Sequence, residues 1–106
     1  MSTEYITVLI TAPNEEEAAK ISRTIVEESL AACVSIIRSV RSIYRWQGRV
    51  EDESEVLMIA KTKRALFDRL KGRIKELHSY EVPEIIGLPV IEGSKQYLDW
   101  LSQETE

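Results

Sequence analysis

Two side chains stand out for metal or nucleophilic chemistry, because the chain has one cysteine and one histidine. Cys33 lies in the apolar string AACV just after a predicted helix, and His78 ends another predicted helix. Reactive and metal-binding thiolates favour helix N-termini and cationic neighbours, so the surroundings of Cys33 favour a small buried residue. An imidazole at the negative end of a helix dipole suits a structural role, which is the interpretation favoured for His78.

Neither residue lies in a metal-binding motif. The sequence contains no Cys-x-x-Cys and no His-x-x-x-His pair, so one chain cannot form a closed site for a soft metal from Cys and His alone. Adjacent subunits could combine Cys33 and His78 with carboxylates such as Glu81 and Glu84, which follow His78 in the stretch LHSYEVPEIIGLPV. The alternatives for the two glutamates are solvated carboxylates or partners of basic residues. Pro83 stops the helix, which favours a joint between a helix and a strand.

A basic cluster is a second candidate site, for an anion. Lys61, Lys63 and Arg64 surround the predicted start of the second helix, and helix N-termini attract phosphates and carboxylates. A solvated basic turn is the alternative. The chain has no Gly-x-Ser-x-Gly elbow, no Gly-rich phosphate loop, and no base, nucleophile and oxyanion donor at recognisable spacing. We therefore expect a binding protein that is not an enzyme and has no organic cofactor.

Length and composition restrict the class of protein. A chain of 106 residues is expected to form one domain, residues 1–106. The net charge of −4 argues against a nucleic-acid partner, and no apolar stretch approaches the ~20 residues of a membrane helix. The apolar run near the N-terminus is typical of a strand and not of a signal peptide. A single cysteine fits a reducing cytoplasm, so we expect a cytoplasmic protein.

Hydrophobic periodicity predicts the elements that must position these side chains. In chain order they are a strand at 5–11, a helix at 14–31, strands at 33–46 and 50–62, a helix at 63–78, a strand at 85–91 and a short helix after Gly93-Ser94. Asn14 and Glu17 form a capping box for the first helix. The alternation slips near residues 37–39, as at a β-bulge, and Gln47-Gly48 is typical of a turn.

This order predicts an α+β fold, a ferredoxin-like βαββαβ sandwich in which two helices cover one face of a four-stranded antiparallel sheet. Its central hairpin is extended and a short helix ends the chain. The first helix spans about 27 Å, whereas the strand at 33–46 spans about 45 Å, so ~15–20 Å of hairpin extends past the helices. The extension carries Ile43, Tyr44 and Trp46. A two-stranded ribbon is marginal in water, so we expect other copies of the chain to cover it.

Six stretches, spread in order over nearly the whole chain, form a recognisable set. They are TAPNEEEAAKI (11–21), EESLAACVSII (27–37), SIYRWQGRVEDESE (42–55), KTK (61–63), LHSYEVPEI (77–85) and YLDWL (97–101). Together they resemble the CutA divalent-cation-tolerance proteins. The resemblance implies a ferredoxin-like homotrimer similar to the PII signalling proteins, with long hairpins paired across subunits. It also implies tolerance of copper and other divalent metals, copper binding in some members, and no established enzymatic activity.

The sequence departs from that family at the candidate ligands. Proposed copper ligands in the family include a cysteine late in the first strand and a His-His pair ending the second helix. The matching positions here are Ile10 and Leu77-His78, so only His78 remains from that set. Cys33 matches the usual cysteine of the family. Ser79 replaces the proline that usually follows the histidine, which loosens this joint.

Two functions follow from the residues and the resemblance. The first is a homotrimeric, cytoplasmic metal tolerance or response protein that binds copper(II) or another divalent cation at clefts between subunits. Its expected ligands are His78, Cys33, Glu81 and Glu84. The alternative is a PII-like signalling or scaffold trimer that binds an anionic small molecule or a partner protein in the same clefts. Its expected contacts are Lys61, Lys63 and Arg64, with Trp46 and Tyr80 as walls.

Overall fold

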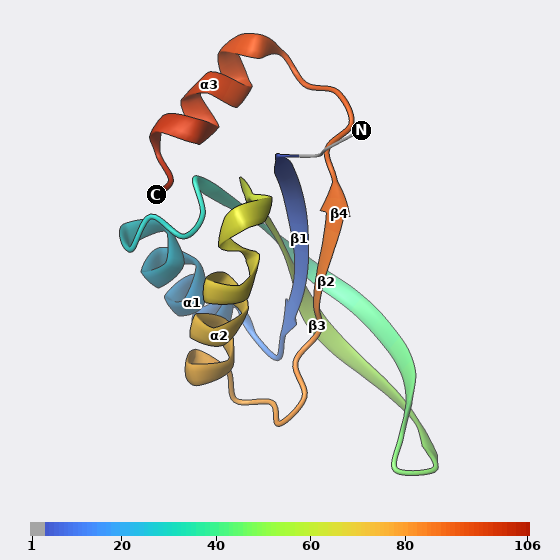
Figure 1. The fold of residues 1–106 in the computed structure, drawn as a ribbon. Coiled ribbons are helices and arrows are strands. Elements are labelled where there is room, and N and C mark those ends of the chain that lie inside the picture. Colours follow the sequence, from blue (N-terminus) through green and yellow to red (C-terminus); the bar gives the residue numbers. More distant parts are fainter. Residues whose placement is uncertain (1–3) are drawn as a thin grey trace.

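The strands and helices follow one another in the order that the sequence predicts (Figure 1). The computed structural model describes residues 4–106. Its elements are β1 (Tyr5–Ala12), α1 (Glu15–Glu27), β2 (Cys33–Trp46), β3 (Arg49–Lys63), a 3-10 turn (Arg64–Leu66), α2 (Phe67–Leu77), β4 (Ile85–Pro89) and α3 (Lys95–Gln103). The four strands form one antiparallel sheet in the order β2-β3-β1-β4. The prediction of a ferredoxin-like sandwich is confirmed.

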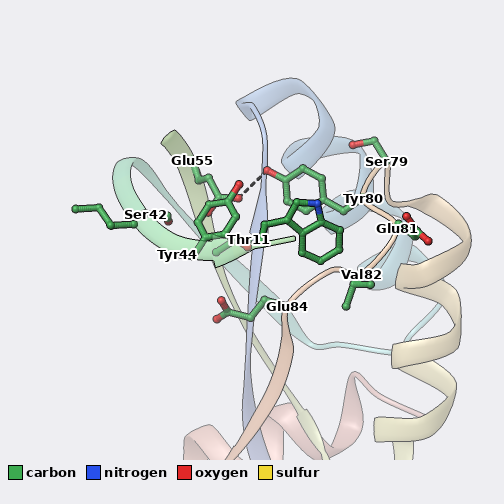
Figure 2. A pocket seen from close by; sticks show the side chains of 11 residues that line it. Thr11, Ser42, Tyr44, Glu55, Ser79, Tyr80, Glu81, Val82 and Glu84 are labelled. Atoms are coloured by element: carbon green, nitrogen blue, oxygen red, sulfur yellow. Dashed lines mark hydrogen bonds between the residues drawn. The ribbon is translucent and has the colours of Figure 1, made fainter. Parts of the chain in front are cut away.

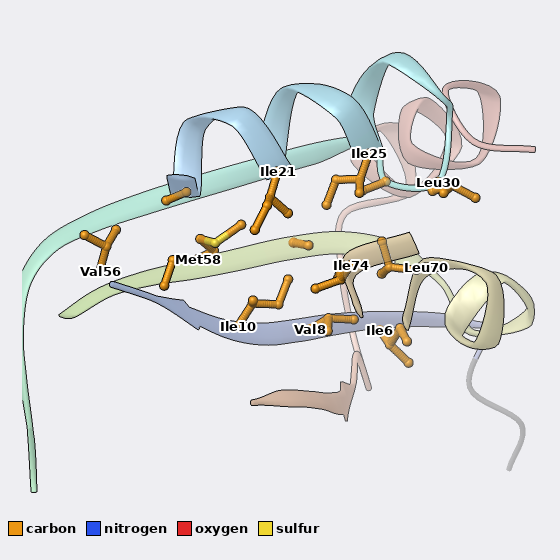
Figure 3. Packing of buried hydrophobic residues seen from close by; sticks show 14 residues of the cluster. Ile6, Val8, Ile10, Ile21, Ile25, Leu30, Val56, Met58, Leu70 and Ile74 are labelled. Atoms are coloured by element: carbon orange, nitrogen blue, oxygen red, sulfur yellow. The ribbon is translucent and has the colours of Figure 1, made fainter. Parts of the chain in front are cut away.

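The core lies between the sheet and the two longer helices, which cover one face (Figure 3). Alternate residues of the central strands, including Val8, Ile10 and Met58, have no exposed surface and meet Ile21 and Ile25 of α1. Each such side chain contributes about 1.5–3 kcal/mol through burial. The residues between them point to the opposite face, which we call the open face because α1 and α2 do not reach it. It carries Thr7, Leu9, Thr11, Leu57, Ile59, Lys61, Ile86 and Leu88.

The first helix begins where the sequence predicts and ends earlier. The side chain of Asn14 accepts a hydrogen bond of 2.8 Å from the Glu17 N–H, as expected of the cap. The predicted end at residue 31 is wrong, because Ser29 adopts a left-handed φ of 59°. The N–H groups of Ser29 and Leu30 donate back to the carbonyls of Val26 and Ile25 at 3.0 and 2.9 Å. This is a Schellman ending, and it buries Leu30, which had extended the helical pattern.

We expect Ser29→Gly to raise the free energy of unfolding by about 1 kcal/mol, because glycine adopts a left-handed conformation without the Cβ clash. Urea denaturation of the two proteins measures the difference. Ser54→Gly in β3 is the matched control, since the same change in an extended strand is expected to destabilise by about 0.5–1 kcal/mol. A Ser29→Gly protein no more stable than the parent would contradict this account of the helix end.

Two further boundaries differ from the prediction. The helix predicted from residue 63 begins with the 3-10 turn, and α2 itself starts at Phe67. The strand predicted to reach residue 91 stops at Pro89 because its partner runs out. Pro89 pairs with Ile6 near the start of β1, and the Val90 N–H makes the next bond, to the Tyr5 carbonyl at 3.0 Å.

The β2–β3 hairpin projects from the body, as the strand lengths predict (Figure 1). β1 pairs with β3 only as far as Val56, so residues 40–55 form a two-stranded ribbon about 20 Å long. Gln47 and Gly48, with φ of 50° and 79°, close it as a two-residue turn whose twist suits a hairpin. Ile43 and Val50 are each 64% exposed on the ribbon.

The predicted bulge is present at the base of the ribbon. Ile37 pairs with Leu57 and Val40 with Glu55, so two residues of β2 oppose one of β3. Ser39 provides the kink with a φ of 59°.

Within residues 4–106, no helix is both long and apolar enough to cross a membrane.

Candidate functional site

The candidate site is a pocket of about 660 Å³ between the ribbon and the segment that joins α2 to β4 (Figure 2). Its lining residues are Thr11, Ser42, Ile43, Tyr44, Trp46, Glu55, Ser79, Tyr80, Glu81, Val82 and Glu84. The walls therefore combine three aromatic rings with three carboxylates. None of these lining residues is a lysine or an arginine.

The bulge determines which ribbon side chains face the pocket. Side chains alternate along a strand, and one extra residue reverses the alternation beyond it. Val40 pairs with Glu55, which lies on the same face of β3 as Leu57. Tyr44 and Trp46, at even spacing from Val40, therefore share the open face with Glu55. If the same sequence continued from Ile37 in regular alternation with no bulge, Ile43 and Arg45 would take their place.

Tyr80 connects the joining segment to the ribbon. Its hydroxyl donates a hydrogen bond of 2.6 Å to the Glu55 carboxylate, and Glu55 is only 7% exposed (Figure 2). Burial, followed by this hydrogen bond and the charge of Glu55, raises the pKa of Tyr80. Burial and the nearby carboxylate of Glu53 also raise the pKa of Tyr44. Both phenols thus remain neutral donors at the pocket wall.

His78 lies behind this wall with its side chain fully buried. Its Nε2 is 2.7 Å from the Thr11 carbonyl, and its Nδ1 accepts a hydrogen bond of 3.0 Å from the Tyr80 N–H. The tautomer with its proton on Nε2 satisfies both of these contacts. Both ring nitrogens are therefore engaged within the chain, and the ring attaches the joining segment to the end of β1.

Glu17 of α1 strengthens the same joint. One of its carboxylate oxygens accepts hydrogen bonds from the Ser79 N–H at 3.0 Å and the Ser79 hydroxyl at 2.9 Å. The same oxygen lies 3.3 Å from His78 Nδ1. Ser79 thus supplies two bonds to α1 that a proline could not donate, so the expectation that serine here loosens the joint is wrong.

Cys33 lies elsewhere on the open face. It pairs with Lys61, whose Nζ is 3.8 Å from the thiol sulfur and donates to the Ser35 hydroxyl at 2.8 Å. Lys61 also pairs with Thr7, four residues along β1 from Thr11, so Cys33 is about 13 Å along the sheet from the His78 contact. One chain does not bring the cysteine and the histidine together.

The other two basic residues also lie away from the pocket. Lys63 Nζ donates to the backbone carbonyls of Thr105 and Glu106 at 3.3 and 3.2 Å. Arg64 borders a second pocket, of about 550 Å³, beside Phe67. A single chain therefore separates this cluster from Trp46 and Tyr80, and its binding of an anion stays a prediction.

A metal centre does not form within one chain in the part that the structure describes. Among residues 4–106, no three His, Cys, Asp or Glu side chains are grouped so that they could hold a metal ion. Glu81 and Glu84 do line the same pocket and offer oxygen donors, which suit hard divalent cations. The metal role of His78, Cys33, Glu81 and Glu84 stays a prediction.

Sequence reasoning missed Glu55 as a pocket residue. The signal was available in the slip of alternation near residues 37–39, because a bulge there turns Tyr44 toward the face that Glu55 occupies. The register between β2 and β3 was needed to use that signal. Glu17 was predicted to complete a capping box, but its carboxylate accepts hydrogen bonds from Ser79 instead, and this contact had no sequence signal.

The fold defines a small ferredoxin-like protein with a projecting hairpin and a pocket at the base of that hairpin. Comparison with known families places it more closely: residues 6–104 match the family model of the CutA1 divalent ion tolerance protein. The chain belongs to this family.

Two named relatives illustrate the similarity. A divalent-cation tolerance protein CutA of Thermus thermophilus is 53% identical over 98 residues, covering 92% of this chain and 95% of that protein. The chloroplastic CutA of Arabidopsis thaliana is 44% identical over 94% of this chain, which spans 55% of that protein.

Solved structures agree with the fold. The chain is similar to the Thermus thermophilus Cut A1 structure with a TM-score of 0.94 and 51% identity, over 96% of this chain and 99% of that one. For CutA1 of Oryza sativa the TM-score is 0.95 at 40% identity, over 99% and 96% of the two chains.

Proposed function

We propose that the protein is a homotrimeric divalent-cation tolerance protein of the cytoplasm, without enzymatic activity, that binds copper(II) or another divalent cation at clefts between subunits. The observation that carries this proposal is the acidic pocket at the base of the ribbon. Its carboxylates, Glu55, Glu81 and Glu84, have no lysine or arginine among the pocket residues. Glu55 is buried, and a buried negative charge favours a compensating cation, whereas Glu81 and Glu84 are exposed and offer oxygen donors beside it.

The ligand set is divided between subunits in this proposal. Glu81 and Glu84 contribute oxygen donors from one chain, and a neighbouring subunit completes the coordination. His78 holds the segment that carries them, because its ring fixes Tyr80 directly before Glu81. Cys33 belongs to a different part of the open face, where it serves a site only if a second chain approaches.

The names of the relatives support a role with divalent cations, and they name different cellular compartments. The Thermus thermophilus relative is called a divalent-cation tolerance protein, the Arabidopsis thaliana relative chloroplastic, and a structural relative from Archaeoglobus fulgidus periplasmic. The cytoplasm is proposed for this chain because its single cysteine suits a reducing compartment.

Calorimetric titration with copper(II) tests the ligand set. The double variant Glu81→Gln/Glu84→Gln keeps the shape of both side chains and removes their charge, so the affinity is expected to fall about 10–100-fold. Glu76→Gln, on the exposed side of α2, is the matched control and should bind as the parent does. Equal isotherms for the double variant and the parent would remove both glutamates from the site, and a loss with Cys33→Ser alone would move the site to the cysteine.

A further inference from the structure

We propose that the pocket beneath the ribbon binds a small organic cation of the alkylammonium class, held between its aromatic walls and the carboxylate of Glu55. This site is distinct in chemistry from the coordinated metal of the proposed function and does not depend on it. Three observations carry the inference: an uncompensated buried charge, an aromatic lining and the size of the space.

The uncompensated charge is that of Glu55. The residue is only 7% exposed and lines the pocket. Its carboxylate accepts one hydrogen bond, from the neutral hydroxyl of Tyr80. Among residues 4–106 no lysine, arginine or histidine forms an ion pair with it. The two arginines at the base of the ribbon, Arg38 and Arg41, are engaged by Glu15 at 2.8 Å and by Asp52 at 2.6 Å. A buried carboxylate in this state favours a ligand that brings positive charge.

The aromatic lining selects the kind of cation. Tyr44, Trp46 and Tyr80 all border the same space, and the faces of aromatic rings attract ammonium groups. The bulge turns the first two toward the pocket, and the bond to Glu55 fixes the third. Figure 2 shows Tyr44, Glu55 and Tyr80 meeting on one side, with Glu84 and Val82 on the other. Rings around a carboxylate suit a partly apolar cation better than a strongly hydrated one.

The size of the pocket suits a small molecule. About 660 Å³ lies within the ~300–1,000 Å³ range of small-molecule sites. The described side chains of one chain form no group of three metal ligands, so a coordinated ion needs donors from a second subunit. An alkylammonium ion needs only one carboxylate and surrounding rings.

Fluorescence of Trp46 tests the inference directly. The chain has two tryptophans, so Trp100→Phe on α3 leaves Trp46 as the sole indole reporter. The chelator-treated protein is titrated with tetramethylammonium chloride, with potassium chloride as the ionic-strength control and tert-butanol as a neutral molecule of similar size. We expect saturable quenching by tetramethylammonium alone, with a dissociation constant of about 1–10 mM.

The carboxylate is tested by Glu55→Gln, which keeps an acceptor for the Tyr80 hydroxyl and removes the charge. Its affinity for tetramethylammonium is expected to fall about tenfold, whereas Glu76→Gln in the same background leaves it unchanged. Circular dichroism verifies that both variants fold. Absence of saturation, equal binding of tert-butanol, or an unchanged affinity in Glu55→Gln would each overturn the inference. Because metal is removed beforehand, failure here leaves the copper titration unaffected, and failure of that titration leaves this result standing.

Discussion

Replacing His78 with alanine is expected to lower the free energy of unfolding by about 3 kcal/mol. The side chain is fully buried, so its removal leaves a cavity. It also leaves the Tyr80 N–H without its 3.0 Å acceptor and the Thr11 carbonyl without its 2.7 Å contact. Denaturant unfolding monitored by circular dichroism measures the loss. A change of this size would establish His78 as the residue that attaches the pocket wall to the sheet.

Ser79→Ala is the matched control for this experiment. It removes the neighbouring hydroxyl, whose 2.9 Å bond to Glu17 is exposed, so the expected loss is below about 1 kcal/mol. If His78 served only as a metal ligand, His78→Ala would keep its stability in chelator and lose copper affinity. That pattern would contradict the structural role, whereas destabilisation in the absence of metal supports it.

The double substitution Ile43→Asp/Val50→Asp is expected to break the proposed assembly into single chains of 12.2 kDa. Both residues are 64% exposed and lie on the same face of the ribbon, as the pairing of Arg45 with Val50 and of Ile43 with Asp52 shows. Two carboxylates placed against a neighbouring subunit would lack partners, which should raise the dissociation constant at least about a hundredfold. Light scattering coupled to gel filtration measures the mass.

Val26→Asp provides the comparison for that experiment. Val26 is an exposed apolar residue of α1, 38% exposed and outside the ribbon, so the charge should leave the mass unchanged. A parent protein that is already a stable single chain at micromolar concentration would refute the assembly, because the ribbon would then persist without a cover. Dissociation by Val26→Asp and not by the ribbon variant would place the interface on the helices.

Much of the fold could be predicted because local patterns agree with the tertiary structure. The cap at Asn14, the slip near residues 37–39 and the Gln47-Gly48 turn are each decided within a few residues. The end of α1 could not be predicted in the same way. Its left-handed residue is Ser29 where glycine is usual, and the apolar residues that follow continue the helical pattern while serving the core.

The candidate site was only partly predictable for a different reason. Trp46, Tyr80, Glu81 and Glu84 were all named from the sequence, and the structure places them around one pocket. The sequence could not show that Cys33 and Lys61 lie away from this pocket, because that separation depends on distances along the sheet, which the strand register determines. The carboxylate of Glu55 became visible only when that register showed which face of β3 it occupies.

The extra residue at the base of the ribbon has a consequence for how such a protein diversifies. Deleting Ser39 would restore the regular pleat and still leave Val40 opposite Glu55, so every side chain of the arm would keep its side. Tyr44 and Trp46 would remain above Glu55. In the course of evolution this hinge could thus lose a codon while the cavity kept its chemistry.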